Sequence, residues 1–219
     1  MEQILNRRHP LHVLTDKIEE FLIMTIRTAK EELLEPLLRK MRINRVVPIV
    51  KQYPFCSLLD IGCGWEARFL LSIENLIAEG FGIDFKAPEI CRPKISTISA
   101  EISKKLPFED SRFDVVTLLA VLEHFFYPED ILQEINRVLK PGGVLVGTVP
   151  SKIARPVLEF LSYRLHIINP DEISDHKFYY DKNSLTSLLH RTGFIKITHK
   201  YFQLGMNNFF LAYTCREGK

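Results

Sequence analysis

The chain has 219 residues, of which 46% are hydrophobic and 26% charged, and its formal net charge is +2. This composition is typical of one globular domain with a sizeable core and argues against an intrinsically disordered chain, and the net charge gives no strong sign of a nucleic-acid-binding surface. The four cysteines have no CxxC spacing and no apolar run is long enough to cross a bilayer. We therefore expect a cytoplasmic protein with reduced thiols, no transmembrane segment and no nucleic-acid partner.

Residues 1–54 are expected to form an N-terminal helical extension. Apolar residues recur at spacings of three and four from residue 11 onward, and the stretch contains no glycine. A helical layer packed on the domain and a lid over a substrate site explain this pattern equally well, and a homodimer formed through these helices is a further expectation. A small basic run is expected to be a solvated helix face, because acidic residues lie just upstream, and a patch that faces phosphate or nucleic acid is the alternative. Its members are Arg39, Lys40, Arg42 and Arg45.

From residue 55 onward, short apolar runs alternate with helical stretches. Strands alternating with helices predict parallel βαβ units, and nearly continuous apolar strands fit a sheet covered on both faces. Residues 55–219 are therefore expected to form a doubly wound α/β domain. The predicted strands are Leu58–Gly62, Gly80–Asp84, Lys94–Ser99, Phe113–Leu119 and Gly143–Thr148, and the predicted helices are Glu66–Glu79 and Pro128–Leu139.

The C-terminal third has a different pattern. Residues 151–182 are a long insertion, predicted as a helix to about Leu165 and then a loop, and long loops in compact domains are usually functional. Asp181 or Ser184 is expected to cap a helix that ends near Arg191. Residues 194–202 and 208–214 are predicted to be two strands forming a terminal antiparallel hairpin.

A turn with two glycines follows the first predicted strand, in Asp60-Ile61-Gly62-Cys63-Gly64. Glycine allows positive φ and close approach of a ligand, as required where a nucleotide-like molecule crosses the carboxyl ends of parallel strands. Dinucleotide-binding folds use the same geometry, but the acids here favour another ligand. Asp60 would face the ammonium group of an amino acid, and Glu66 at the helix start would repel a pyrophosphate. Asp84 ends the second strand, where an acid can bind both hydroxyls of a ribose.

This turn resembles the first motif of class I S-adenosylmethionine-dependent methyltransferases. Four further segments between residues 57 and 150 resemble motifs of that family in the same order. They are Gly82-Ile83-Asp84, Leu106–Val116, Ala120-Val121-Leu122-Glu123-His124 and Arg137–Gly143. The resemblance implies a seven-stranded sheet of order 3-2-1-4-5-7-6 with strand 7 antiparallel, which the terminal hairpin fits. It also implies S-adenosylmethionine as cofactor and S-adenosylhomocysteine as product. The chain departs from the family at Glu66, where a third glycine is usual.

The resemblance assigns cofactor binding to residues at the carboxyl ends of the strands. Asp84 would bind the ribose and Glu101 the adenine amine, while Phe85 would pack on the adenine face or be an ordinary core or surface phenylalanine. Backbone groups of the glycines and of the end of the fourth strand would hold the methionine part. The expected set is Asp60, Gly62, Gly64, Asp84, Phe85, Glu101, Leu119 and Ala120.

His176 and His124 are the candidate catalytic residues. The pair Glu123-His124 resembles that of ubiquinone-pathway O-methyltransferases and small-RNA 3′-end methyltransferases, which add an acid three residues earlier and can use a divalent metal. That position is Ala120 here, so we expect no metal site. A turn-capping role for His124 and a surface position for His176 are the alternatives. A dyad of Asp175 with His176 cannot be assumed from their adjacency, because neighbours on an extended chain point opposite ways.

The expected function is transfer of the sulfonium methyl group to an oxygen, nitrogen or carbon nucleophile of a small-molecule, lipid or glycan acceptor. The sulfonium is already activated, so the protein needs mainly to align the nucleophile, and a base helps when the nucleophile is a hydroxyl. The alternative is a non-catalytic S-adenosylmethionine-binding protein that acts through a partner.

Overall fold

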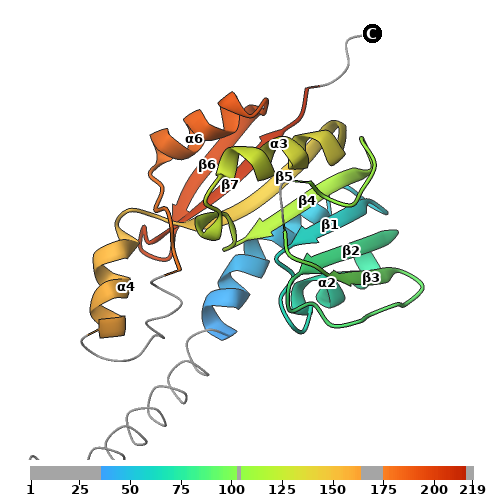
Figure 1. Ribbon diagram of the computed structural model, residues 1–219, viewed down its shortest axis with the longest axis horizontal. Helices are drawn as coiled ribbons and strands as arrows, with labels where there is room; N and C mark the ends of the chain where they lie inside the picture. The colour runs from blue at the N-terminus through green and yellow to red at the C-terminus, as the bar shows by residue number, and fades with distance from the viewer. Residues whose placement is uncertain (1–35, 103–104, 164–174, 216–219) are drawn as a thin grey trace, which may run out of the picture.

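The computed structural model describes residues 36–102, 105–163 and 175–215 (Figure 1). The helical pattern expected from residue 11 to residue 35, and residues 164–174 of the predicted insertion, lie outside the described residues. The described part of the N-terminal extension is a helix over residues 36–50 that ends in turns ahead of the first strand.

A seven-stranded sheet of order β3-β2-β1-β4-β5-β7-β6 forms the centre of the protein. The first five strands are parallel, and β7 runs antiparallel to both β5 and β6. The predicted topology is therefore confirmed. The strands are β1 (Ser57–Ile61), β2 (Glu79–Asp84), β3 (Ile95–Ser99), β4 (Phe113–Leu119), β5 (Leu139–Pro150), β6 (Ile195–Phe202) and β7 (Asn207–Tyr213).

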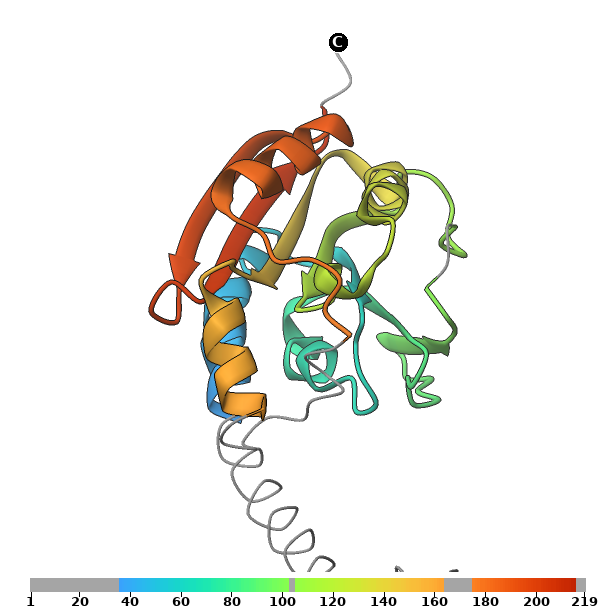
Figure 2. The same cartoon turned by 60° about the vertical axis from the view of Figure 1, so that its left-hand side comes forward.

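Helices cover both faces of the sheet (Figure 2), which the alternation of side chains along the strands requires. Val115 packs into a buried cluster with α2 and the N-terminal helix, whereas Val116 packs into a second cluster with α3 and α6. None of the described helices is long and apolar enough to cross a membrane. The helices after the first are α2 (Arg68–Ser72), η1 (Glu74–Leu76), η2 (Leu122–His124), α3 (Pro128–Val138), α4 (Ala154–Tyr163) and α6 (Lys182–Arg191).

Two elements differ from the sequence-based expectation. The single helix predicted over Glu66–Glu79 is instead α2 followed by η1. At the end of α2 the hydroxyl of Ser72 donates a hydrogen bond to the carbonyl of Phe69, a bond of the kind that bends helices. β5 begins four residues before the predicted strand. Its glycine-containing start is accommodated by a register irregularity against β4, with Gly142 at a φ of +78°.

Candidate functional site

Two adjoining cavities open where β1, β2 and β4 end. The larger has a volume of about 680 Å³ and the smaller about 200 Å³, and both are lined by Gly62 and Leu119. Parallel strands that meet at such a switch point generally place their ligand there. Among the expected site residues, the larger cavity is lined by Gly62, Asp84, Phe85, Glu101, Leu119, Ala120 and His124. The smaller is lined by Asp60, Gly62, Gly64 and Leu119, and His176 lines neither.

The glycine turn after β1 has backbone angles that favour glycine. Gly62 has a φ of +76°, and a Cβ atom there would lie 2.2 Å from Cγ2 of Val121. Gly64 has a φ of +71°, but a Cβ there would meet no atom of the described residues within 4 Å. Gly62 is therefore required by the packing of the protein itself, whereas Gly64 borders open space that a ligand can fill.

Asp84 is held in place by the turn that it faces. Its Oδ2 accepts a hydrogen bond from the backbone N–H of Gly64 at 3.0 Å, and its Oδ1 accepts one from the N–H of Lys86 at 2.8 Å. The two bonds orient the carboxylate at the wall of the larger cavity, beside the exposed ring of Phe85. This geometry suits an acid that binds a diol.

Asp60 lies at the inner end of the smaller cavity with only 2% of its surface exposed. Thr117 Oγ1 donates a hydrogen bond to Asp60 Oδ1 at 2.7 Å. Burial raises the pKa of Asp60 to about 7, the Thr117 hydrogen bond opposes that rise, and the nearby Asp84 adds to it. A cationic group in the smaller cavity would favour the ionised form.

Arg39 and Arg42 line the smaller cavity together with Asp60, so the solvated helix face expected for the basic run is wrong for these two residues. The third arginine of the run, Arg45, lies over the ring of Phe202 at 4.4 Å from its centroid. The sequence did indicate that Arg39 and Arg42 lie together, since residues three apart share one face of a helix. Which face points at the cavity depends on the packing of the helix against the sheet.

The loop after β4 forms the opposite wall of the larger cavity. Ala120 has a φ of +58°, in the left-handed region that L-residues seldom adopt, and such strain is concentrated at functional sites. Phe126 and Tyr127 line the same cavity and are 69% and 70% exposed. Aromatic surface left exposed at a cavity mouth suits an apolar or ring-containing ligand. These two residues carried no motif that sequence reasoning could have used.

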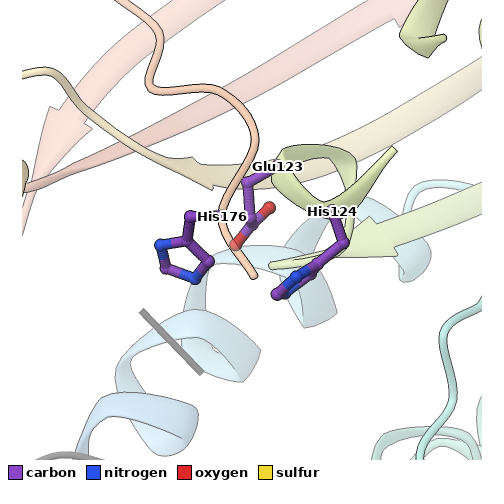
Figure 3. A group of neighbouring side chains, drawn as sticks. All are labelled: Glu123, His124 and His176. Atoms are coloured by element: carbon purple, nitrogen blue, oxygen red, sulfur yellow. The ribbon is translucent and has the colours of Figure 1, made fainter. Parts of the chain in front are cut away.

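Glu123, His124 and His176 lie together although 52 residues separate the two histidines (Figure 3). The backbone brings them together, because the carbonyl of Glu123 accepts a hydrogen bond from the N–H of Lys177 at 2.7 Å. The two imidazole centroids are 5.0 Å apart. The structure thus joins both candidate catalytic residues in one cluster.

Each imidazole of this cluster has a hydrogen-bond partner at Nδ1. His124 Nδ1 lies 2.9 Å from Oδ2 of Asp175, and His176 Nδ1 lies 3.0 Å from the hydroxyl of Tyr179. Asp175 therefore pairs with His124. Burial and the adjacent His124 lower the pKa of His176 to about 4, so that its imidazole is neutral at neutral pH.

Glu123 is the buried acid of the cluster, with 2% of its surface exposed. Its Oε2 has no hydrogen-bond partner among the described residues. Burial raises the pKa of Glu123 to about 8, although its backbone hydrogen bond and Arg42 favour the charged form. A buried carboxyl group with an unpaired oxygen is unfavourable unless a proton or a cation occupies it.

The contribution of Glu123 to stability should therefore fall as the pH rises from 5 to 8, whereas the lowered pKa of His176 makes its contribution rise between about pH 4 and 6.5. A carboxyl whose folded-state pKa is about 8, against 4.5 as the unfolded value, stabilises the fold below pH 4.5 and loses that contribution as the pH rises through 8. For Glu123 the loss is on the order of 3 kcal/mol of unfolding free energy. Urea unfolding in buffer with EDTA should show a flatter pH dependence for Glu123→Gln, in which the opposing contributions of Asp60 and His176 remain. The exposed Glu109→Gln variant is the control, and an unchanged slope in Glu123→Gln would contradict the assignment.

Comparisons with known proteins agree with this geometry. A family model described as "Methyltransferase domain" matches residues 59–147. The demethylmenaquinone methyltransferase of Staphylococcus saprophyticus is 29% identical over 182 residues, which are 71% of this chain and 77% of that protein. The ubiquinone/menaquinone biosynthesis C-methyltransferase UbiE of Neisseria gonorrhoeae is 38% identical over 74 residues, which are 32% of this chain and only 30% of that protein.

Solved structures extend the likeness in fold beyond the matched sequence. A SAM-dependent methyltransferase from Archaeoglobus fulgidus superposes with a TM-score of 0.65 at 19% identity, covering 84% of this chain and 97% of that chain. The residues matched by the family model run from β1 to β5, and most of the residues that line the two cavities lie within this range.

Proposed function

Because the chain belongs to the class I S-adenosylmethionine-dependent methyltransferases, we propose that it is an enzyme that methylates a small-molecule acceptor. The observation that carries the proposal is the pair of cavities that meet at Gly62 and Leu119. The cofactor has a nucleoside and an amino acid joined through its sulfonium. The two cavities offer matching surroundings, with the diol-binding geometry of Asp84 on one side and Asp60 with two arginines on the other.

The cofactor supplies an activated methyl group, and the chain's residues hold and orient it. We propose Asp84 for the ribose, Glu101 and Phe85 for the adenine, and Asp60 for the ammonium group. The open space at Gly64 fits a ligand passing over the turn. Leu119 and Ala120 would contact the cofactor from the end of β4.

Arg39 and Arg42 are proposed to bind the cofactor's carboxylate, since guanidinium groups pair well with carboxylates. Arg39→Ala should weaken S-adenosylhomocysteine binding by about 10-fold, the loss of a charge-assisted hydrogen bond. Affinity for 5′-methylthioadenosine, which keeps the nucleoside but lacks the amino acid, should not change. Calorimetry with both ligands makes the comparison, and Lys40→Ala, on the exposed side of the same helix, is the matched control. Equal losses for the two ligands would contradict a carboxylate contact.

The non-catalytic alternative requires a cavity plugged by side chains above Leu119 and His124. Both residues line a cavity of about 680 Å³, which favours the enzyme. The aromatic residues at its mouth favour an apolar or ring-containing acceptor. The two relatives named above are menaquinone- or ubiquinone-pathway enzymes by name. We propose an acceptor of similar character, with His124 as a polar group in the wall of the larger cavity and His176 next to His124, outside the cavity lining.

Transfer of labelled methyl groups from S-adenosylmethionine to lipid and metabolite extracts tests the proposed activity. With an acceptor in hand, His176→Ala should lower kcat by about 100-fold or more, the size of effect typical for a residue that handles the acceptor's proton or orientation. Cofactor affinity should stay constant, because His176 lines neither cavity. His190→Ala, a residue near the end of α6, is the control. Full turnover in His176→Ala would leave His124 as the better candidate.

A lid role for residues 1–54 and substrate contact by residues 151–182 are part of the same proposal. The cytoplasmic location, the homodimer and the absence of a nucleic-acid partner stay predictions.

A further inference from the structure

We propose that Glu123, His124 and His176 form a binding site for a divalent transition-metal ion such as Zn²⁺, next to the larger cavity. Two segments of the chain supply the ligands, η2 and the irregular segment over residues 175–179. The proposal concerns ion binding and is tested without turnover, so its failure is distinct from failure of the proposed methyl transfer.

The geometry is the first support. One ligand atom from each of the three side chains lies within 4.8 Å of the other two. In a zinc site with bonds of about 2.0–2.2 Å, neighbouring ligand atoms are separated by about 3.5 Å. The cluster is thus an open arrangement that rotation of side chains brings onto an ion. Figure 3 shows the Glu123 carboxylate in the space between the two imidazoles.

The unpartnered oxygen of Glu123 is the second and independent support. This side chain is 98% buried, and its Oε2 has no hydrogen-bond partner among the described residues. Buried carboxylates are rare in proteins unless a hydrogen bond, an opposite charge or a metal ion satisfies them. A cation between Glu123 and the two histidines supplies the missing partner.

The hydrogen bonds at the far side of each imidazole are the third support. The carboxylate of Asp175 accepts from Nδ1 of His124, which leaves Nε2 with its lone pair. The hydroxyl of Tyr179 lies 3.0 Å from Nδ1 of His176, and in the tautomer in which this nitrogen donates, Nε2 keeps its lone pair. Metal-binding histidines commonly donate their second ring N–H to such partners, which set the tautomer and the ring orientation.

The ligand set indicates the class of ion. Two imidazoles and one carboxylate suit zinc and similar transition metals, whereas magnesium and calcium prefer sites built from oxygen atoms. Three protein ligands leave a coordination position for water or for an oxygen of the acceptor. His124 also lines the larger cavity, so that position is placed to face the acceptor. The expectation of no metal rested on Ala120, which lacks an acid, and took no account of His176 as a third ligand.

Calorimetric titration of the EDTA-treated full-length protein with ZnCl₂ tests the site, in a Cys91→Ser/Cys215→Ser background that removes the exposed thiols. We expect one ion bound per chain and no displacement by excess magnesium. Glu123→Gln and His176→Ala should each weaken zinc binding by at least about 10- to 100-fold. His190→Ala should leave the zinc affinity unchanged. With Co²⁺ in place of zinc, the visible absorption of a low-symmetry site should appear in the parent protein and be lost in His176→Ala.

Two results would overturn the proposal. One is the absence of stoichiometric zinc binding to the parent protein. The other is binding that neither Glu123→Gln nor His176→Ala weakens, which would place the ion elsewhere on the chain. His176→Asn, which retains a polar side chain, serves if the alanine variant does not fold, as judged by circular dichroism and its melting temperature. In that case, zinc binding that neither Glu123→Gln nor His176→Asn weakens would overturn the proposal.

Discussion

Asp84→Ala should weaken binding of S-adenosylhomocysteine by about 2–3 kcal/mol, or roughly 30- to 150-fold, through the loss of charge-assisted hydrogen bonds to the ribose. Both oxygens of Asp84 are already oriented by backbone N–H groups of Gly64 and Lys86. The carboxylate is therefore preorganised, and little of its binding energy is lost in ordering the side chain. Calorimetric titration with S-adenosylhomocysteine measures the loss, and NAD should not bind to the parent protein.

Asp84→Ala also removes the acceptor for the Gly64 N–H, so a second variant separates loop order from ligand contact. Asp84→Asn keeps a side-chain oxygen for that N–H but removes the charge, and it should give an intermediate loss of affinity. Glu109→Ala, at an exposed position, is the matched control. Parental affinity in Asp84→Ala would rule out the ribose assignment.

Gly62→Ala and Gly64→Ala should have different consequences although the two glycines are neighbours in one turn. At Gly62 the new methyl group would lie 2.2 Å from Cγ2 of Val121, and its φ of +76° is unfavourable for alanine. We expect Gly62→Ala to lower the free energy of unfolding by about 2–4 kcal/mol, combining overpacking with the cost of a left-handed backbone. Cofactor binding should be lost as well, because the turn must move.

Gly64→Ala should lower the free energy of unfolding by only about 1–2 kcal/mol, the cost of a left-handed backbone at alanine. Overpacking adds nothing, because the new methyl group would meet no described atom within 4 Å. The methyl group would, however, occupy the space proposed for the cofactor, so the affinity for S-adenosylhomocysteine should fall far more than the stability. Urea unfolding and calorimetry on the same samples separate the two effects. Adding Val121→Ala to Gly62→Ala removes the methyl groups that the new Cβ meets. The double variant should therefore regain the share of the unfolding free energy that overpacking costs. A Gly64→Ala protein that binds with parental affinity would contradict a cofactor-cradling turn.

The order of elements was predictable because it depends on local pattern. β4 was predicted at its observed bounds, and Asp181 caps α6 in a capping box with Ser184, as the sequence indicated. Periodicity, capping and glycine positions act within a few residues, so they can be read from the chain alone. The sheet order followed from five motifs in register together with the terminal hairpin.

The sites were predictable only where a motif ends a strand. Asp60, Gly62 and Asp84 lie at the carboxyl ends of parallel strands, which must meet at one edge of the sheet. Their side chains therefore converge at a place that the sequence alone determines. Arg39 and Arg42 belong to a helix outside this rule, and their approach to the smaller cavity depends on how that helix packs on the sheet.

Only the tertiary structure shows that Glu123 and His124 lie next to His176. Local sequence placed the first two in a turn after β4, and it placed His176 in a segment with no regular periodicity. The contact arises from a backbone hydrogen bond between Glu123 and Lys177, which the sequence does not encode in any local pattern. Local preferences specify the elements, whereas contacts between segments 50 residues apart depend on how those elements pack in three dimensions.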